Sequence, residues 1–405
     1  MKKFLPLFLL SVCLYSPSSA QSCLADGITF ETQADIDNFQ SENPGCVTIE
    51  GNVLIKGDEI SDLSGLSVLT GIDGRLRFYS LTALENMQGL NNLTYVGGDL
   101  DIYTWPGKTT SLISLSGLDN IETVGGDLLI TGNDKIATLE GLNGLITVEG
   151  NINISGNILL ANFNGLDSLT EIGADCWIGE NPQLENLEGI ESLHSIGGYL
   201  ELYENGSLQS LDGLSGLHTI GSTLKINNND ELESLSGMEG LNSIGSYLEI
   251  YGNDVLVSID SMKYLDPATI TSLYIGYNTK LSMCALENIC QYIATTNATV
   301  DIEENATGCE NEASVEDACA SNSNVYDIWD SGILFPNPAI EEEPVRIISR
   351  NRVSEISIYT ITGSYFHAYK EINNFEIVLP GLPSGQYIIK VENKDTHGFY
   401  HLIVK

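Results

Sequence analysis

The feature that most limits what this chain can fold into is a repeat of 24 residues through its middle. Each copy has an Ile-Gly pair, then an apolar-x-apolar triplet, then an asparagine and a leucine at intervals of three residues. The clearest copies begin at Ile172, Ile196, Ile220 and Ile244. A fixed period in this range predicts a solenoid, in which each coil covers the apolar face of its neighbour.

The apolar triplet of each copy predicts a short strand with two side chains pointing inward, as for Leu200 and Leu202. Eleven such strands can be placed, from the one ending at Ile55 to Val300-Asp301-Ile302. The apolar residues that follow each strand have a period of three and include glycine, which does not sustain an α-helix. We therefore expect short extended or 3₁₀ sides joined by tight corners.

One asparagine per coil stands just past the strand. Stacked turns leave backbone groups facing inward, and a buried asparagine can satisfy them. The column predicts an internal ladder rather than a ligand site. Its members are Asn133, Asn157, Asn181, Asn205, Asn229, Asn253 and Asn278.

Cysteines mark both ends of the repeats. Cys23 and Cys46 lie in a predicted N-terminal cap, residues 21–48, where Thr32 and Asp35 predict a capped short helix. Residues 49–283 form the solenoid, and residues 284–319 a second cap with a helix near 285–294. In an exported chain most cysteines pair; this second cap holds four, which allow three connectivities. They are Cys284, Cys290, Cys309 and Cys319.

Cys176 occupies the strand position that leucine holds in the next three coils. We expect a buried thiol that packs as a small apolar group. No base that would activate it as a nucleophile is evident in the sequence.

The repeat also carries a family resemblance. The phrases Leu-x-Gly-Leu-x2-Leu-x2-Ile-Gly-Gly and Leu-x-Ile-x2-Asn, behind a cysteine-bracketed cap, resemble the receptor L-domain superfamily over residues 23–319. The exported versions from Bacteroidetes are the most similar. The resemblance implies a right-handed parallel β-helix related to leucine-rich repeats. It implies binding of protein ligands, but no ligand residue can be carried over, because those lie outside the repeat consensus.

The N-terminus predicts export. Lys2 and Lys3 precede an apolar run from Phe4 to Leu14 and then Ser18-Ser19-Ala20, so residues 1–20 read as a signal peptide. The run is too short to span a bilayer, and no other segment is apolar enough to do so.

The chain is strongly acidic, with 17 basic and 55 acidic residues and a formal net charge of −38. Such a surface repels phosphate backbones and argues against a nucleic-acid partner. We expect no cofactor and no metal site, apart from weak binding of Ca²⁺ to the acidic coat.

Residues beside and between the inward pair point out of the sheet, and they form two fields. Asp99, Asp101 and Asp127 make an acidic field in the earlier coils. The later coils predict a flat ligand-binding surface, because aromatic side chains stack on sugar rings and anchor protein partners. The alternative is that tyrosine simply favours strands. The aromatic residues are Trp177, Tyr199, Tyr203, Tyr247, Tyr251 and Tyr274.

Three weaker candidates remain. One coil is four residues longer and carries Trp105 on the extra loop, which is either a binding element or a tolerated insertion. His194 and His218 share a column without a third metal ligand. Glu201 and Glu249 lie two coils apart, roughly 10 Å, near the spacing of an inverting acid/base pair, but recurrent glutamates on an acidic surface explain them better.

The C-terminal part differs in composition. Residues 320–333 predict a linker, and residues 334–405 a small immunoglobulin-like β-sandwich. Its candidate strands are Val345–Ile348, Ile356–Tyr359, Phe375–Leu379, Gln386–Glu392 and Phe399–Val404.

This segment resembles the type A C-terminal sorting domain of the type IX secretion system. The resemblance implies export across the outer membrane, removal of the domain and attachment to surface lipopolysaccharide. The partners would be the secretion machinery and an extracellular glycan or protein, at the surface of a Gram-negative, Bacteroidetes-type bacterium. The motif residues are Pro336, Asn337, Pro338, Gly363, Gly385, Tyr387 and Lys405.

Taken together, the sequence predicts a secreted or surface-attached protein without enzymatic activity, in which a rigid solenoid face binds a glycan or protein. One alternative is a β-helix polysaccharide lyase or hydrolase, by analogy of architecture alone. A lyase of this kind needs basic residues to neutralise an acidic sugar, and Arg75 and Arg77 are the only outward basic pair. The other alternative is a spacer without a ligand.

Overall fold

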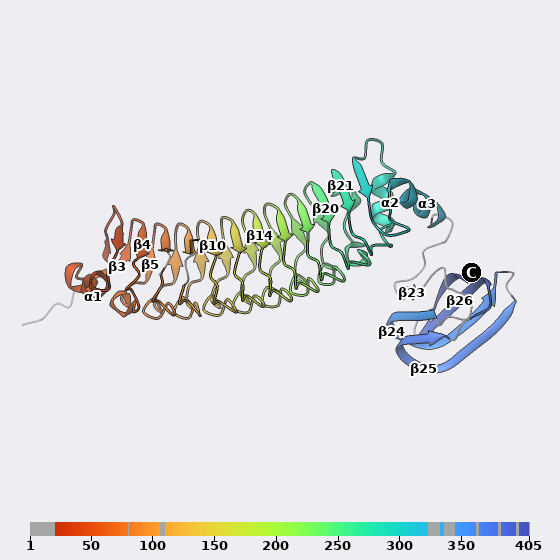
Figure 1. Ribbon diagram of the computed structural model, residues 1–405, viewed down its shortest axis with the longest axis horizontal. Coiled ribbons are helices and arrows are strands. Elements are labelled where there is room, and N and C mark those ends of the chain that lie inside the picture. The colour runs from red at the N-terminus through yellow and green to blue at the C-terminus, as the bar shows by residue number, and fades with distance from the viewer. Residues whose placement is uncertain are drawn as a thin grey trace, which may run out of the picture. The chain divides into compact units, whose positions relative to one another are not determined.

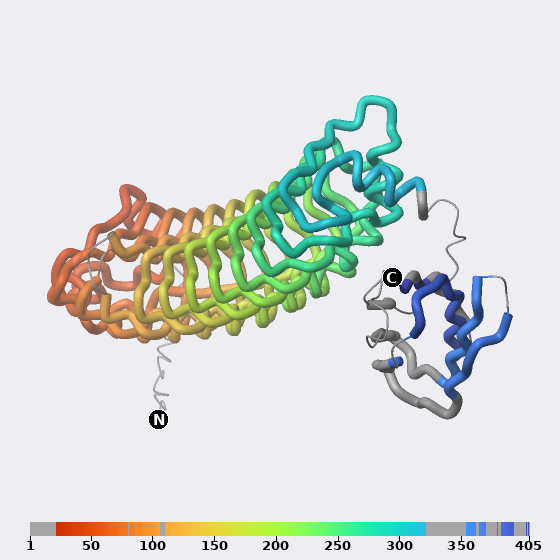
Figure 2. Tube along the Cα trace, turned by 45° about the vertical axis from the view of Figure 1, so that its right-hand side comes forward, coloured from red at the N-terminus to blue at the C-terminus, as the bar shows by residue number. Residues whose placement is uncertain are grey.

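The computed structural model describes residues 21–79, 81–105, 110–322, 333–335, 345–361, 364–379, 382–393 and 397–404. The chain divides into two compact units, with the boundary in the sequence between Ala320 and Ser321. The first unit is the predicted solenoid, and its coils stack one after another (Figures 1 and 2).

The solenoid has two parallel sheets. Each coil up to the one with β19 and β20 adds one strand to each sheet, and the last two add β21 and β22 to one sheet only, so neighbours in a sheet are consecutive coils. The ten-stranded sheet consists of β1 (Gln21–Cys23), β3 (Cys46–Ile49), β5 (Gly71–Ile72), β7 (Tyr95–Val96), β9 (Thr123–Val124), β11 (Thr147–Val148), β13 (Glu171–Ile172), β15 (Ser195–Ile196), β17 (Thr219–Ile220) and β19 (Ser243–Ile244).

The twelve-stranded sheet contains the eleven predicted strands and one more, β2, in the N-terminal cap. Its strands are β2 (Ile28–Phe30), β4 (Val53–Lys56), β6 (Leu76–Tyr79), β8 (Leu100–Tyr103), β10 (Leu128–Thr131), β12 (Ile152–Ser155), β14 (Cys176–Gly179), β16 (Leu200–Tyr203), β18 (Leu224–Asn227), β20 (Tyr247–Tyr251), β21 (Ser272–Gly276) and β22 (Val300–Glu303).

The strands of the central repeats pair in register in the twelve-stranded sheet, so each residue lies opposite the residue 24 positions away. Leu200 lies opposite Cys176 on one side and Leu224 on the other, and Tyr203 lies opposite Gly179 and Asn227. Residues of one sequence column therefore form one spatial row, with neighbours about 4.8 Å apart.

The ten-stranded sheet was not predicted from the sequence. Most of its strands have two residues, such as Ser195–Ile196. A segment of two residues is too short to show an alternating pattern. It forms because the stacked coils hold it in hydrogen-bonding distance of its neighbours, as Ile196 lies opposite Ile172 and Ile220.

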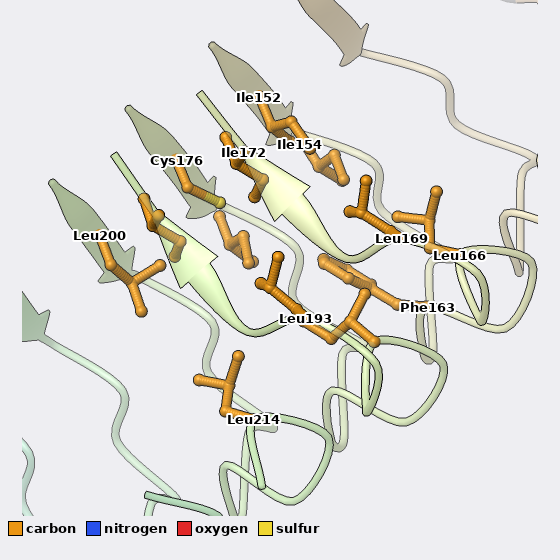
Figure 3. Close-up of a pocket in the computed structure, with 13 residues that line it drawn as sticks. Ile152, Ile154, Phe163, Leu166, Leu169, Ile172, Cys176, Leu193, Leu200 and Leu214 are labelled. Carbon is orange, nitrogen blue, oxygen red and sulfur yellow. The ribbon is translucent and has the colours of Figure 1, made fainter. Parts of the chain in front are cut away.

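The core is a continuous apolar filling between the two sheets and the third side of each coil. Cys176 is buried in it, as predicted, and is the one free cysteine of the described residues. Because its side chain is shorter than the leucines of its column, a small apolar cavity remains between Cys176, Ile152 and Leu200 and the opposite Phe163 (Figure 3).

The asparagine ladder is confirmed. All seven predicted residues are buried, and each amide joins neighbouring coils. Asn205 Nδ2 donates to the carbonyl of Ile178 at 3.0 Å, and its Oδ1 accepts the backbone N–H of Asn181 at 3.2 Å. Asn305 continues the ladder by accepting from Asn278. Before Asn133, the longer coil provides Thr104 in place of an asparagine, and its hydroxyl donates to Asn133 Oδ1.

Glycine recurs at one corner of the central repeats because coils approach closely there. Gly189 has φ +108°, and a Cβ at this position would lie 2.3 Å from the carbonyl oxygen of Phe163 in the preceding coil. This left-handed backbone favours glycine over any residue with a side chain.

Both caps carry the predicted helices and disulfides. At the front, α1 (Gln33–Glu42) begins with a capping box between Thr32 and Asp35, and Cys23 pairs with Cys46. At the back, α2 (Glu287–Ile293) is followed by α3 (Glu312–Asn322), a helix that the sequence pattern did not predict. Figure 1 shows α1 and α2 at opposite ends of the solenoid.

The structure selects one of the three disulfide connectivities left open for the C-terminal cap. Cys284 pairs with Cys309 and Cys290 with Cys319. The second bridge ties α2 to α3. Three short 3₁₀ turns complete the unit: η1 (Ser64–Leu66), η2 (Asp260–Met262) and η3 (Pro267–Thr269).

The second unit is an antiparallel sheet of five strands. Its strands are β23 (Ile333–Phe335), β24 (Val345–Thr360), β25 (Tyr365–Leu379), β26 (Gly385–Asn393) and β27 (His397–Val404). The predicted strands Val345–Ile348 and Ile356–Tyr359 are parts of one long strand, β24. The register of β24 with β25 shifts between Ile348 and Val353, which explains why the sequence pattern is interrupted there.

Of the predicted sorting motif, Gly385 begins β26, and Tyr387 is buried beside it. The Tyr387 hydroxyl donates to the carbonyl of Pro383 at 2.9 Å, and its ring packs edge-on against Phe366 at 5.5 Å. The remaining motif residues lie outside the described part of the chain, as do residues 1–20 of the predicted signal peptide. They are Pro336, Asn337, Pro338, Gly363 and Lys405.

Candidate binding face

The outer face of the twelve-stranded sheet carries the candidate site, because its side chains are not needed to fill the core. Inward residues such as Leu200 and Leu202 are fully buried, whereas Glu201 and Tyr203 between and after them are half-buried on the outside. Two surfaces follow from this alternation. We call the six predicted aromatic residues the aromatic surface, and the face of β6 to β10 around Asp99, Asp101 and Asp127 the acidic surface.

The first part of the aromatic surface lies on β14 and β16. The rings of Trp177 and Tyr199 meet edge to face with centroids 4.8 Å apart. Tyr203 leans over Gly179 of the preceding coil, where a Cβ would lie 2.2 Å from the tyrosine ring. One face of Tyr203 is thus committed to covering the glycine backbone, which is the structural role that the sequence left open.

The second part lies on β20 and β21. Tyr251 stacks on Tyr274 at 5.7 Å and also contacts Tyr277 at 5.2 Å. Tyr277 was not predicted as a site residue, although it is 42% exposed. It stands at a corner with φ +58°, where the corresponding residue of the preceding coil is Gly252. The same corner holds Glu180, Glu204 and Asn228 in earlier coils, also with positive φ, so it is the aromatic ring of Tyr277 that departs from the column and could have signalled it.

The pKa values of the Tyr199, Tyr203, Tyr247 and Tyr274 hydroxyls are raised, chiefly by burial. Burial, followed by the negative charges of Asp175 and Glu201, raises the pKa of Tyr199 to about 12. Burial also raises the pKa of Tyr247 and Tyr274, and the Tyr274 hydroxyl donates to Glu303 Oε1 at 3.1 Å. The surface therefore offers stacking faces together with neutral hydroxyl groups.

Asp99 and Asp127 of the acidic surface are already used as hydrogen-bond acceptors within the solenoid. Asp99 Oδ1 accepts the backbone N–H of Asp127 at 3.0 Å, and Asp127 Oδ1 accepts that of Asn151 at 2.7 Å. Asn151 and Asp175 continue this second ladder to the backbone N–H of Tyr199. The predicted acidic field thus serves to join coils, which the column of short acceptors in the sequence could have indicated.

Asp101 is the buried acid of this surface, at 4% exposure. Arg75 and Arg77 lie over it, with Nε to Oδ2 distances of 3.8 and 3.4 Å, and Arg75 also pairs with Asp99. Burial nevertheless raises the pKa of Asp101, against the attraction of the two guanidinium groups. The outward arginines are therefore paired with carboxylates of the next coil.

Trp105 belongs to the acidic part of the sheet rather than to the aromatic surface. Its ring is 56% exposed and meets Tyr103 edge to face at 6.1 Å, and Tyr103 in turn lies 5.9 Å from Tyr79. The other residues of the predicted loop, 106–108, lie outside the described part of the chain.

The two histidines stack but form no metal site. The rings of His194 and His218 are 6.0 Å apart and nearly parallel, and each Nδ1 contacts a carbonyl of its own coil, Ser192 or Gly216. Within the residues that the structure describes, no group of three or more His, Cys, Asp and Glu side chains could hold a metal ion.

The two-coil spacing of Glu201 and Glu249 is confirmed by the strand register, with Lys225 between them. Glu249 accepts a hydrogen bond from Asn227 at 2.9 Å and lies 3.9 Å from Lys225 Nζ. Burial raises the pKa of the Cys176 thiol to about 12, which disfavours its nucleophilic thiolate form near neutral pH.

The comparisons with known proteins concern the second unit. Residues 333–405 match the model of the secretion system C-terminal sorting domain. This tail directs export through the type IX secretion system to the cell surface or extracellular space of Bacteroidetes. A search of curated proteins finds no match to the chain.

The described residues include no helix with the length and hydropathy of a membrane span. The chain thus combines a disulfide-capped parallel β-solenoid with a type IX sorting tail that delivers the solenoid outside the cell.

Proposed function

We propose that the exported solenoid is a binding or adhesion module without enzymatic activity, and that its aromatic surface contacts a glycan or protein at the cell surface. The observation that carries the proposal is the gathering of half-buried aromatic rings on the outer face of β14 to β21. Rigid aromatic side chains provide large contact area at low entropic cost and dominate many interfaces.

The resemblance of residues 23–319 to receptor L-domains agrees with this proposal, since those domains bind extracellular ligands through residues outside their repeat consensus. The aromatic surface meets that condition. The inward apolar columns and the asparagine ladder recur in every central coil, whereas Trp177 and the tyrosines vary from coil to coil.

The test is a screen of the mature chain on arrays of glycans and extracellular matrix proteins. We expect binding that is lost on Trp177→Ala and kept on Tyr95→Thr. Tyr95 is the matched control because its ring covers Gly71 just as Tyr203 covers Gly179, but on the other sheet. Binding that survives Trp177→Ala and Tyr251→Asn together would place the site elsewhere.

The main alternative is a polysaccharide lyase or hydrolase. The paired state of Arg75 and Arg77 with Asp99 and Asp101 counts against a lyase, because those cations already face carboxylates. Release of products from any polysaccharide by the purified chain would overturn the non-enzymatic proposal. A chain that binds nothing on the arrays would instead support the spacer alternative.

A further inference from the structure

Two strands of the aromatic surface carry the same outward residues. On β16 they are Tyr199, Glu201 and Tyr203, within the sequence Tyr-Leu-Glu-Leu-Tyr. On β20 they are Tyr247, Glu249 and Tyr251, within Tyr-Leu-Glu-Ile-Tyr. We call these the two Tyr-Glu-Tyr triads. The strand between them, β18, carries Thr223, Lys225 and Asn227 at the same positions.

The register makes the triads translational copies. Glu201 lies opposite Lys225 and Lys225 opposite Glu249, and Tyr203 is likewise followed by Asn227 and then Tyr251. Because each step is one coil, the triads are separated by about 10 Å along the solenoid axis. All strands run parallel, so the two triads also point the same way.

This arrangement restricts the ligand. A partner with a two-fold axis would need two sites in opposite orientations, whereas the triads are related by translation. A linear polymer whose units repeat in one direction can present identical groups to both triads in the same orientation. Two strand spacings separate the triads by about 10 Å. A disaccharide unit of an extended polysaccharide is of similar length, because it contains two pyranose rings in line.

The chemistry of the triads also selects a class of ligand. Each offers two tyrosine rings for the apolar faces of sugars and one carboxylate that can accept hydrogen bonds from hydroxyl or amino groups. In the second triad Glu249 Oε1 already accepts from Asn227, so Oε2, near Lys225 Nζ, is the oxygen left for a ligand. The formal charge of −38 for the whole chain disfavours a polyanion.

We propose that the two triads are equivalent subsites for successive disaccharide units of one linear polysaccharide, uncharged or bearing amino groups, that runs along the solenoid axis. Trp177 and Tyr274 extend the subsites at either end, since Trp177 contacts Tyr199 and Tyr274 stacks on Tyr251. Lys225 lies between the subsites and contacts Glu249. This inference rests on the proposed function of the aromatic surface and adds the ligand class, its direction and its repeat.

The experiment is calorimetric titration of the mature chain with oligomers of glucose, N-acetylglucosamine and glucosamine, from disaccharide to hexasaccharide. We expect two disaccharides per chain but one tetrasaccharide or longer oligomer per chain. The longer oligomers should bind at least about tenfold more tightly, because the second contact is intramolecular. One ligand per chain at every length would overturn the inference.

Two variants separate the subsites. Tyr203→Thr and Tyr251→Asn place residues that the same row already holds in Thr131 and Asn227, so the fold is kept. Either change should reduce the disaccharide count from two to one and remove the advantage of long oligomers. Tyr95→Thr, which matches Thr123 of its own row, should change neither.

A change of spacing tests the repeat directly. Deletion of residues 207–230 removes one coil and moves the triads onto adjacent strands, while deletion of residues 135–158 removes a coil outside them. We expect the first deletion alone to abolish the gain for long oligomers. Equal gains in both deletion variants would contradict a ligand that bridges the triads.

These outcomes are distinguishable from failure of the proposed function. If arrays detect a ligand that depends on Trp177 but no oligosaccharide binds, the surface is a binding site and the polysaccharide assignment is wrong. If the chain binds a protein with repeated units but none of the oligosaccharides, the surface is likewise a binding site and the polysaccharide assignment is wrong. If nothing binds at all, both proposals fail together.

Discussion

The acidic and aromatic surfaces share one sheet and one backbone register, yet their outward side chains serve different ends. Under both, the inward positions are apolar, and the asparagine ladder runs from Asn133, in the last coil of the acidic surface, through the aromatic surface. On the acidic surface, Asp99 and Asp127 accept backbone N–H groups of the next coil. That second ladder ends at the backbone N–H of Tyr199, one coil after the aromatic surface begins with Trp177.

The difference teaches which residues of a solenoid carry information about function. A side chain that satisfies the backbone of its neighbour is explained by folding alone. Tyr199 and Tyr247 stand in the same column as those acids but lack a carboxylate to accept the backbone N–H. What they contribute instead is a ring on the outside of the sheet, so the aromatic surface is where the column departs from its structural use.

The largest loss of stability should come from substitutions in the asparagine ladder, which the two surfaces share. We compare two substitutions in the ladder: Asn157→Ala, next to the acidic surface, and Asn205→Ala, beneath the aromatic surface. Each leaves a backbone N–H and a backbone carbonyl without partners, so each should lower the free energy of unfolding by about 3 kcal/mol. Urea denaturation measures this, with the exposed Asn242→Ala as control. Costs that differ widely between the two asparagines would show that the surfaces do not share one framework.

A smaller effect separates structural from functional aromatics. A Cβ at Gly179 would meet the ring of Tyr203, and one at Gly71 would meet the ring of Tyr95. Gly179→Ala and Gly71→Ala should each cost about 1–2 kcal/mol by overpacking, measured by thermal unfolding. Only Gly179→Ala should weaken ligand binding, because it displaces a ring of the aromatic surface. Loss of binding in both variants would point to general destabilisation.

A substitution at Cys176, in the core beneath β14, should stabilise the chain. Cys176→Leu restores the residue of the neighbouring coils and fills the cavity beside Phe163, so we expect a gain of about 1 kcal/mol. Cys176→Ala enlarges the same cavity and should cost about as much. Both are measured by denaturant titration. If Leu destabilises the chain, Phe163 has already adapted to the shorter side chain.

The smallest effect is a pH dependence confined to the acidic surface. The pKa of Asp101 is raised in the folded chain, so the native state binds its proton more readily than the unfolded state. Stability contributed by this group is therefore present below the unfolded pKa and lost as pH rises through the folded pKa. Asp101→Asn removes the titration.

The free energy of unfolding of the Asp101→Asn variant, minus that of the unsubstituted chain, should accordingly increase from about pH 3.5 to pH 7. Parallel denaturation curves across this range provide the measurement. A relative stability that falls with rising pH would mean that Arg75 and Arg77 outweigh burial. Tyr203→Thr on the aromatic surface should show no such trend in the same range.

Much of the fold was readable from the sequence because its determinants repeat. The column of Asn205 and the pair Leu200 and Leu202 recur at a fixed interval, so burial could be assigned by periodicity alone. The capping box of Thr32 and Asp35 was likewise local. The ten-stranded sheet could not be predicted, because two residues such as Ser195 and Ile196 carry no pattern of their own.

The candidate site was only partly predictable for a related reason. The sequence placed Trp177 and the tyrosines on one face, but it could not tell that Tyr203 covers Gly179 or that Asp99 is bound to a backbone N–H. Tyr277 was missed because its column was read as a corner. Whether an outward side chain is committed or available depends on what the next coil places against it.

The sequence by itself determined the solenoid, its caps and the sorting tail, because periodic apolar residues, cysteines and short motifs act through local rules. The disulfide partners Cys284–Cys309 and Cys290–Cys319, and the second ladder through Asp127, became known from the tertiary structure alone. These depend on the lateral register of stacked coils, in which residues 24 positions apart become neighbours.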